Sequence, residues 1–272
     1  MTDTITGAGH IAERPLRHVS RELRASGYRS ADEGNARQLY AAGEGDPPYV
    51  DSPLARSLIG APVSRSAPLE VADELERIRL SGAKLTWKNM GPRETQREFE
   101  DWMRAPEEGP LPPLTPSTGM NCWEIILYAG VKRGVFTHSG LHEFYTPERG
   151  PGNQVLPEWF ERFPELLWRH GMLERYFPGD LGSAQPRRGD LVLWNQDAHV
   201  AMATGRFIGK DIDRSPEVYS FWPVPGPFTV DKVTGSWATV IDAVTPTSID
   251  VLTGYMREKA YPDVVRFGRG PW

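Results

Sequence analysis

The chain has 272 residues, a formal net charge of −5 and one cysteine. This mildly acidic balance gives no sign of a nucleic-acid or anionic-membrane partner, and a lone cysteine excludes an internal disulfide and a cysteine-cluster zinc site. The chain has no apolar run of about 18 residues that could span a bilayer, and residues 1–14 lack the apolar core of a secretory signal. We therefore expect a protein without a membrane span that is cytoplasmic, or is exported without a cleavable signal peptide.

The first quarter of the chain differs in composition from the rest. Residues 1–65 are rich in Gly, Ala, Arg, Ser and Pro and show little sustained periodicity. This composition predicts an irregular or partly disordered N-terminal arm, with one helix in the region 30–42. We expect residues 66–272 to form the folded domain.

Two helices are predicted ahead of the cysteine. The first covers residues 68–80, Gly82 follows it as a stop signal, and its apolar stripe is Leu69, Ala72, Leu75 and Ile78. The second covers residues 92–104, and its inner face carries Phe99, Trp102 and Met103. Residues 105–116 are dense in proline, which predicts an extended lead into the next element.

The stretch around Cys122 predicts a third helix with a defined start. Asn121 is a good N-cap, and Glu124 stands three residues later, where it can complete a capping box. Cys122 then falls in the first turn, where unpaired N–H groups and the helix dipole favour an anion. We expect a thiol pKa below its ordinary value and hence a nucleophile, although a lone cysteine can equally be a small buried hydrophobe.

The second half of the chain predicts a sheet. After a loop-rich crossover at 130–152 and a kinked helix at 157–170, residues 190–194 and 199–204 form two short strands around a turn, which indicates a hairpin. Further strands are predicted at 217–222 and 237–244, and Thr247 caps a last helix at 248–258. Helices followed by an antiparallel sheet predict an α+β domain.

His199 opens the second strand of this hairpin. On the pleat it shares a face with Ala201 and Ala203, whose small side chains leave room for a helix. If the Cys122 helix lies on that face, thiol and imidazole become neighbours, as nucleophilic catalysis with a general base requires. A histidine that only makes hydrogen bonds at a hairpin end is the alternative.

Three stretches together resemble the NlpC/P60-type branch of papain-like cysteine hydrolases. They are Asn121-Cys122-Trp123-Glu124, Gly189-Asp190-Leu191-Val192-Leu193-Trp194 and His199-Val200-Ala201-Met202-Ala203-Thr204-Gly205. In that family the cysteine heads a helix packed on an antiparallel sheet, and a Gly-Asp-Leu-Val strand precedes a His-Val strand that ends in glycine. The resemblance covers about residues 120–222, and the family's usual Asp-Cys-Ser-Gly is replaced by the Asn121 to Glu124 tetrad.

The resemblance implies a papain-like fold for 66–272, with Cys122 as nucleophile and His199 as general base. A third polar group would come from the following strand, where Ser220 is best placed and Glu217 stands behind it. The backbone N–H of Cys122 would be one oxyanion donor. We expect four residues to bind substrate, namely Asn121, Trp123, Trp194 and Trp222.

The expected function is a cysteine amidase or peptidase that acts through a Cys122 thioester, on peptidoglycan fragments or other short peptides. No cofactor is expected. The arm also fits a bacterial effector or toxin with an immunity or delivery protein as partner. Two alternatives stay open: an acyltransferase, transglutaminase or glutamine deamidase that uses the same thioester, and a non-catalytic binding module on a decayed hydrolase fold.

No metal site is expected. His138 and His142 stand four residues apart, but Ser139-Gly140 between them indicates a turn, and no zinc-protease glutamate lies inside the pair.

Overall fold

The computed structural model describes nine stretches of the chain: residues 66–87, 97–145, 174–180, 182–194, 199–210, 214–221, 243–258, 264–270 and 272. Predictions that concern residues 1–65, the helix at 157–170, residues 237–242 of the strand at 237–244 and Trp222 lie outside them. Residues 243 and 244 are described and precede β7 without being part of a strand. The elements in chain order are α4 (Ala67–Leu80), β1 (Thr86–Trp87), α5 (Glu98–Arg104), β2 (Gly119–Met120), α6 (Cys122–Lys132), α7 (His138–Tyr145), β3 (Glu174–Tyr176), β4 (Asp190–Trp194), β5 (His199–Ile208), β6 (Ser215–Ser220), β7 (Thr245–Ser248), α9 (Ile249–Glu258) and β8 (Val265–Arg269).

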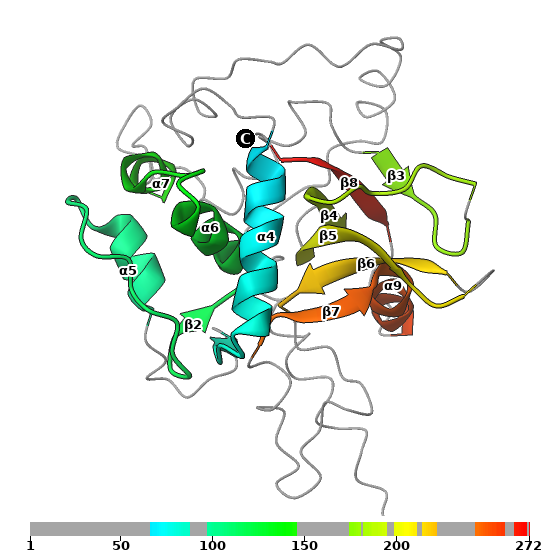
Figure 1. The fold of residues 1–272 in the computed structure, drawn as a ribbon, viewed down its shortest axis with the longest axis horizontal. Helices are drawn as coiled ribbons and strands as arrows, with labels where there is room; N and C mark the ends of the chain where they lie inside the picture. Colours follow the sequence, from blue (N-terminus) through cyan, green and yellow to red (C-terminus); the bar gives the residue numbers. More distant parts are fainter. Residues whose placement is uncertain are drawn as a thin grey trace, which may run out of the picture.

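The described part is an α+β fold built on an antiparallel sheet. Its strand order is β3-β8-β4-β5-β6-β7, and every neighbouring pair is antiparallel (Figure 1). The predicted hairpin strands are β4 and β5, whose register pairs Trp194 with His199. Two short strands, β1 and β2, form a separate parallel pair.

The helices α4 and α5 form because each carries an apolar face that is buried in the core. Pro68 stands in the first turn of α4, and Ala72, Leu75 and Ile78 are buried as the spacing predicted. Leu69 of the predicted stripe is exposed instead, and Val71 takes its place in the core. In α5 the predicted inner residues Phe99, Trp102 and Met103 are all buried.

The predicted crossover at 130–152 contains a helix, α7, which corrects the expected turn at Ser139-Gly140. Thr137 supplies the start signal, because its hydroxyl accepts the N–H of Gly140 at 3.1 Å. Leu141 and Phe144 then fall three residues apart on one face and are buried. Burial of this apolar face outweighs the low helix propensity of serine and glycine.

The C-terminal part of the sheet differs from the expectation. Thr247, predicted as a helix cap, lies in β7, and α9 begins two residues later at Ile249, close to the predicted start. Strand β8 was not predicted, since its five residues include two arginines and a glycine and show little alternation. In the sheet, β8 lies between β3 and β4.

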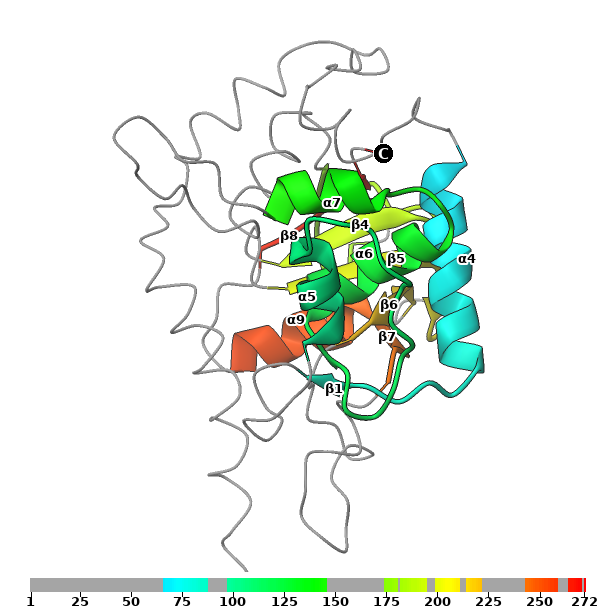
Figure 2. The same cartoon turned by 90° about the vertical axis from the view of Figure 1, so that its left-hand side faces the viewer.

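The two faces of the sheet are covered by different helices. On the α4 face, Arg206 of β5 binds Glu76 of α4 at 3.3 Å, and its guanidinium also reaches the Tyr219 hydroxyl at 3.3 Å. On the α9 face, the Trp194 indole and the Tyr176 hydroxyl bind side chains of α9. Figure 2 shows α4 and α9 on opposite sides of the strands.

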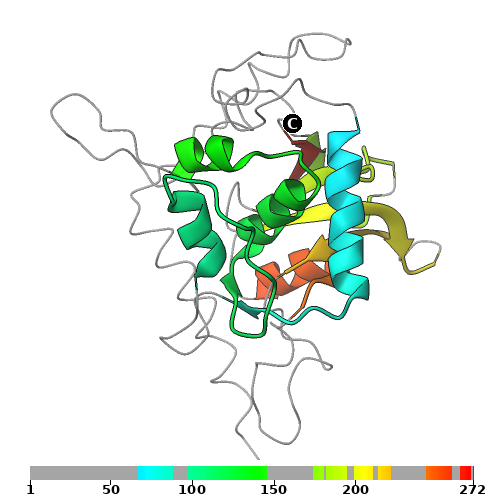
Figure 3. The same cartoon turned by 60° about the vertical axis from the view of Figure 1, so that its left-hand side comes forward.

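The central helix α6 packs against α4 and β5, and Figures 1 and 3 show α4 and α6 side by side. Its residues from Cys122 to Gly130 are all buried. In the described residues, no helix is both long and apolar enough to cross a membrane.

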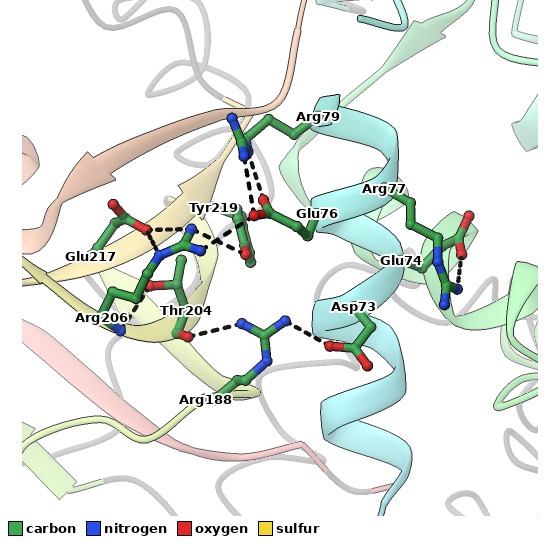
Figure 4. Close-up of polar contacts among 10 residues, drawn as sticks. All are labelled: Asp73, Glu74, Glu76, Arg77, Arg79, Arg188, Thr204, Arg206, Glu217 and Tyr219. Carbon is green, nitrogen blue, oxygen red and sulfur yellow. Dashed lines mark hydrogen bonds and ion pairs between the residues drawn. The ribbon is translucent and has the colours of Figure 1, made fainter. Parts of the chain in front are cut away.

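A network of charges fastens α4 to the sheet (Figure 4). The Glu76 carboxylate accepts hydrogen bonds from Arg79 at 2.6 Å and Arg206 at 3.3 Å, and Arg206 also binds Glu217 at 2.7 Å. Arg188, ahead of β4, bridges Asp73 and the backbone carbonyl of Thr204. Charges from α4, β5 and β6 therefore lie together along one side of the helix.

Candidate active site

Cys122 stands at the first position of α6, behind a complete capping box. The Asn121 side-chain oxygen accepts the N–H groups of Trp123 and Glu124, both at 2.9 Å, and the Glu124 carboxylate accepts the N–H of Asn121 at 2.8 Å. The predicted helix start is confirmed. These three bonds hold the first turn in place and thereby fix the position of the thiol.

The thiol is buried, which overturns the expectation of a lowered pKa. Backbone N–H groups of Val200, Cys122 and Trp123 do stabilise the thiolate, but loss of hydration outweighs them and raises the pKa of Cys122 to about 12. The side chain is only 5% exposed. A first-turn position favours an anion only where water or a charge partner also supports it, so the helix alone does not activate this cysteine.

His199 and Ser220 form a buried pair on neighbouring strands. The imidazole Nε2 lies 3.0 Å from the Ser220 hydroxyl oxygen. Burial lowers the pKa of His199 to about 3, since the charged imidazolium would lose its hydration. Ser220 thus makes the contact that an orienting third residue would make, while its catalytic role stays a prediction. Glu217 does not stand behind this pair, because it binds Arg206 on the α4 face.

The first turn of α6 meets β5 beside His199. His199 shares the α9 face of the sheet with Trp194 and Ser220. Helix α6 packs against α4 and β5, and the expectation that it covers the face of Ala201 and Ala203 stays a prediction. The thiol meets β5 at the backbone N–H of Val200, one residue beyond His199. The structure brings Cys122 to the start of the histidine strand through this backbone contact.

The residues expected to bind substrate have structural contacts of their own. Asn121 caps α6, and Trp123 and Trp194 are buried in the core. The Trp194 ring lies 5.4 Å from the His199 ring between centroids, with the planes tilted by 37°. Their role toward a substrate stays a prediction.

The histidine pair of α7 has a structural task. His138 Nε2 contacts the carbonyl of Trp102 at 2.9 Å, and His142 Nδ1 contacts that of Met103 at 3.3 Å. The two rings therefore tie α7 to the last turn of α5. Among the described residues, no group of three His, Cys, Asp or Glu side chains is placed to hold a metal ion.

Sequence reasoning missed one residue near this site, Thr253. Its hydroxyl oxygen accepts the indole N–H of Trp194 at 3.0 Å. The signal was available in part, because Ile249, Leu252 and Met256 form the apolar stripe of the predicted last helix and Thr253 lies beside them. A polar residue on a buried stripe needs a hydrogen-bond partner, but the sequence does not identify that partner.

Comparison of the chain with family models, with curated proteins and with solved structures finds no match.

Proposed function

We propose that the protein is a cysteine amidase or peptidase of the NlpC/P60 type, in which Cys122 attacks an amide carbonyl and His199 moves the protons. The observation that carries the proposal is the meeting of the capped Cys122 turn with the start of β5, where the histidine is held by Ser220. A nucleophile, a base and a residue that orients the base are the three parts that such chemistry needs.

The protonation states define how the reaction would begin. With a thiol pKa of about 12 and an imidazole pKa of about 3, both groups are neutral at pH 7. The sulfur would therefore bond to the carbonyl carbon while its proton passes to His199, for which Nδ1 serves because Nε2 faces Ser220. The C–N bond then breaks, the amine leaves with that proton, and water hydrolyses the Cys122 thioester.

The backbone N–H of Cys122 is the proposed donor to the oxyanion that forms on the carbonyl oxygen. It stands at the N-terminus of α6, where it has no partner within the helix. The proposed substrate class is peptidoglycan stem peptides and other short peptides. It is based on the resemblance of the stretch from Gly189 to Gly205 to NlpC/P60-type hydrolases.

A panel of peptidoglycan fragments and short peptide amides, incubated with and without a primary amine, tests the proposal. The full chain should release amine from at least one of them, and Cys122→Ala and His199→Ala should abolish the release. Thr204→Val is the matched control, because this buried residue of β5 faces away from His199. Turnover that survives in Cys122→Ala would refute the mechanism. Incorporation of the added amine into the product would identify a transferase instead.

A non-catalytic binding module is the second candidate, and burial of the site favours it. Cys122 is 5% exposed and His199 is fully buried, so neither side chain is open to a substrate in this conformation of the described residues. This candidate predicts no turnover of any member of the panel. It also predicts that Cys122→Ala retains the affinity of the full chain for whichever fragment binds.

A further inference from the structure

The imidazole of His199 has a second neighbour besides Ser220, the indole of Trp194. Trp194 pairs with it across β4 and β5, and the two rings lie 5.4 Å apart between centroids. Trp194 is fully buried and is among the largest side chains of the core. A rotation of the indole would therefore move the surface against which the imidazole rests.

The orientation of this indole is set by one directional hydrogen bond. Trp194 Nε1 donates to the Thr253 hydroxyl oxygen at 3.0 Å, and the Thr253 hydroxyl donates its own proton to the Ile249 carbonyl at 2.7 Å. Since the only proton of the hydroxyl is used in α9, its oxygen presents lone pairs to the indole. Thr253 is itself fully buried, so water cannot replace it.

We propose that Thr253 is a positioning residue for His199 that acts through the Trp194 indole. Ser220 fixes the imidazole at Nε2, and the Trp194 ring, locked by α9, fixes the plane of the imidazole from the side. The inference rests on the proposed function for its effect on turnover, but the position of the ring can be measured without a substrate.

The substitution that tests this is Thr253→Val in the full chain, which removes the hydroxyl and keeps the shape. Thr253→Ser keeps the oxygen and serves as the rescue. Thr204→Val is the matched control: Thr204 is also a buried threonine, and its hydroxyl accepts a single backbone N–H, that of Arg206, on the other face of β5. All three proteins are compared with the parent by NMR, with the His199 ring signals assigned by their loss in His199→Asn.

In Thr253→Val, the Trp194 indole N–H signal should move, the His199 ring signals should shift or broaden, and His199 should titrate at a higher pH than in the parent. Thr253→Ser and Thr204→Val should leave the His199 signals unchanged. The proposal is overturned if the indole signal moves in Thr253→Val while the His199 signals and titration stay at their parental values.

If Thr253→Val does not fold, Trp194→Phe is the second variant, because it keeps an aromatic ring and removes the donor. Unchanged His199 signals in Trp194→Phe would also overturn the proposal.

Turnover separates this inference from the proposed function. On a substrate found in the panel, kcat of Thr253→Val should fall about tenfold with KM unchanged, because a displaced base slows proton transfer more than it weakens binding. A parent chain without turnover would refute the proposed function, whereas the NMR comparison would still support or overturn the role of Thr253.

Discussion

The pKa values of the two titratable residues of the site are shifted in opposite directions by one cause. Burial disfavours any charge, so it raises the pKa of the acidic Cys122 thiol and lowers the pKa of the basic His199 ring. The pair is therefore neutral over the whole physiological range, and an ion pair of thiolate and imidazolium is not its resting state.

The raised pKa predicts slow alkylation of Cys122 by iodoacetamide. With a pKa of about 12 rather than the ordinary 9.0, the thiolate fraction at pH 8 falls about a thousandfold. The rate measured between pH 6 and 8 on the folded chain should be lower than that of the chain in urea by at least this factor, because burial also blocks access. Rapid labelling at pH 6 would show an activated thiolate and contradict the prediction.

The lowered pKa of His199 predicts a loss of stability in acid. The unfolded chain gains a proton near pH 6.5, whereas the folded chain takes it up only near pH 3. This contribution is complete above pH 6.5 and is lost as the pH falls toward 3. Between pH 7 and 4 the free energy of unfolding, measured in urea, should fall by on the order of 3 kcal/mol more in the parent than in His199→Asn. Equal losses in both would contradict the assignment.

The stability of a single helix depends in part on the side chain that caps its end. The start of α6 depends on Asn121, which accepts two backbone N–H groups. Asn121→Ala should lower the free energy of unfolding by about 1 kcal/mol, since the two N–H groups lose their acceptor. Asn121→Ser keeps an acceptor and should retain most of the stability. Equal stability of the Ala and Ser variants in chemical denaturation would show that the cap is not needed.

The attachment of α4 depends on the charge network of Figure 4. A double-mutant cycle of Glu76→Gln and Arg206→Gln should give a coupling on the order of 1 kcal/mol that shrinks in high salt, because Arg206 is half exposed. The hydrogen bond from Arg79 is the main cause that lowers the pKa of Glu76 from 4.5 to about 2. The coupling should therefore persist at pH 4 and disappear as the pH approaches 2, and strict additivity at pH 7 would contradict it.

Helix α4, the first helix that the structure describes, is part of the hydrophobic core. Val71, Ala72, Leu75 and Ile78 of α4 are each at most 3% exposed. Burial of four such side chains contributes on the order of 5 kcal/mol, which is comparable to the full stability of many domains.

A truncation series tests where the folded unit begins. A chain that starts at Ser66 should keep its cooperative thermal unfolding, because the described core lies between Ala67 and Trp272. A chain that starts at Gly82 should lose it, since α6 and β5 would be left without the buried face of α4. Unfolding of the longer fragment would show that residues 1–65 are needed for the fold, and cooperative unfolding of the shorter fragment would show that α4 is not.

Features that depend on local residue spacing could be predicted from the sequence alone. The capping box of Asn121 and Glu124, the start of α6 at Cys122, the inner face of α5 and the strands β4 and β5 all follow from signals within a few residues. The α+β class follows from the order of these elements. Helix α7 was missed because its apolar face outweighs a local turn signal.

The chemistry of the site, by contrast, depends on contacts between segments that are distant in the sequence. Whether Cys122 is a thiolate or a thiol depends on how much water the surrounding elements exclude, and whether its turn reaches the start of β5 depends on how α6 packs against α4 and β5. The contact of Thr253 with Trp194 joins residues 59 positions apart. Such contacts depend on packing between distant segments, which residue spacing does not encode.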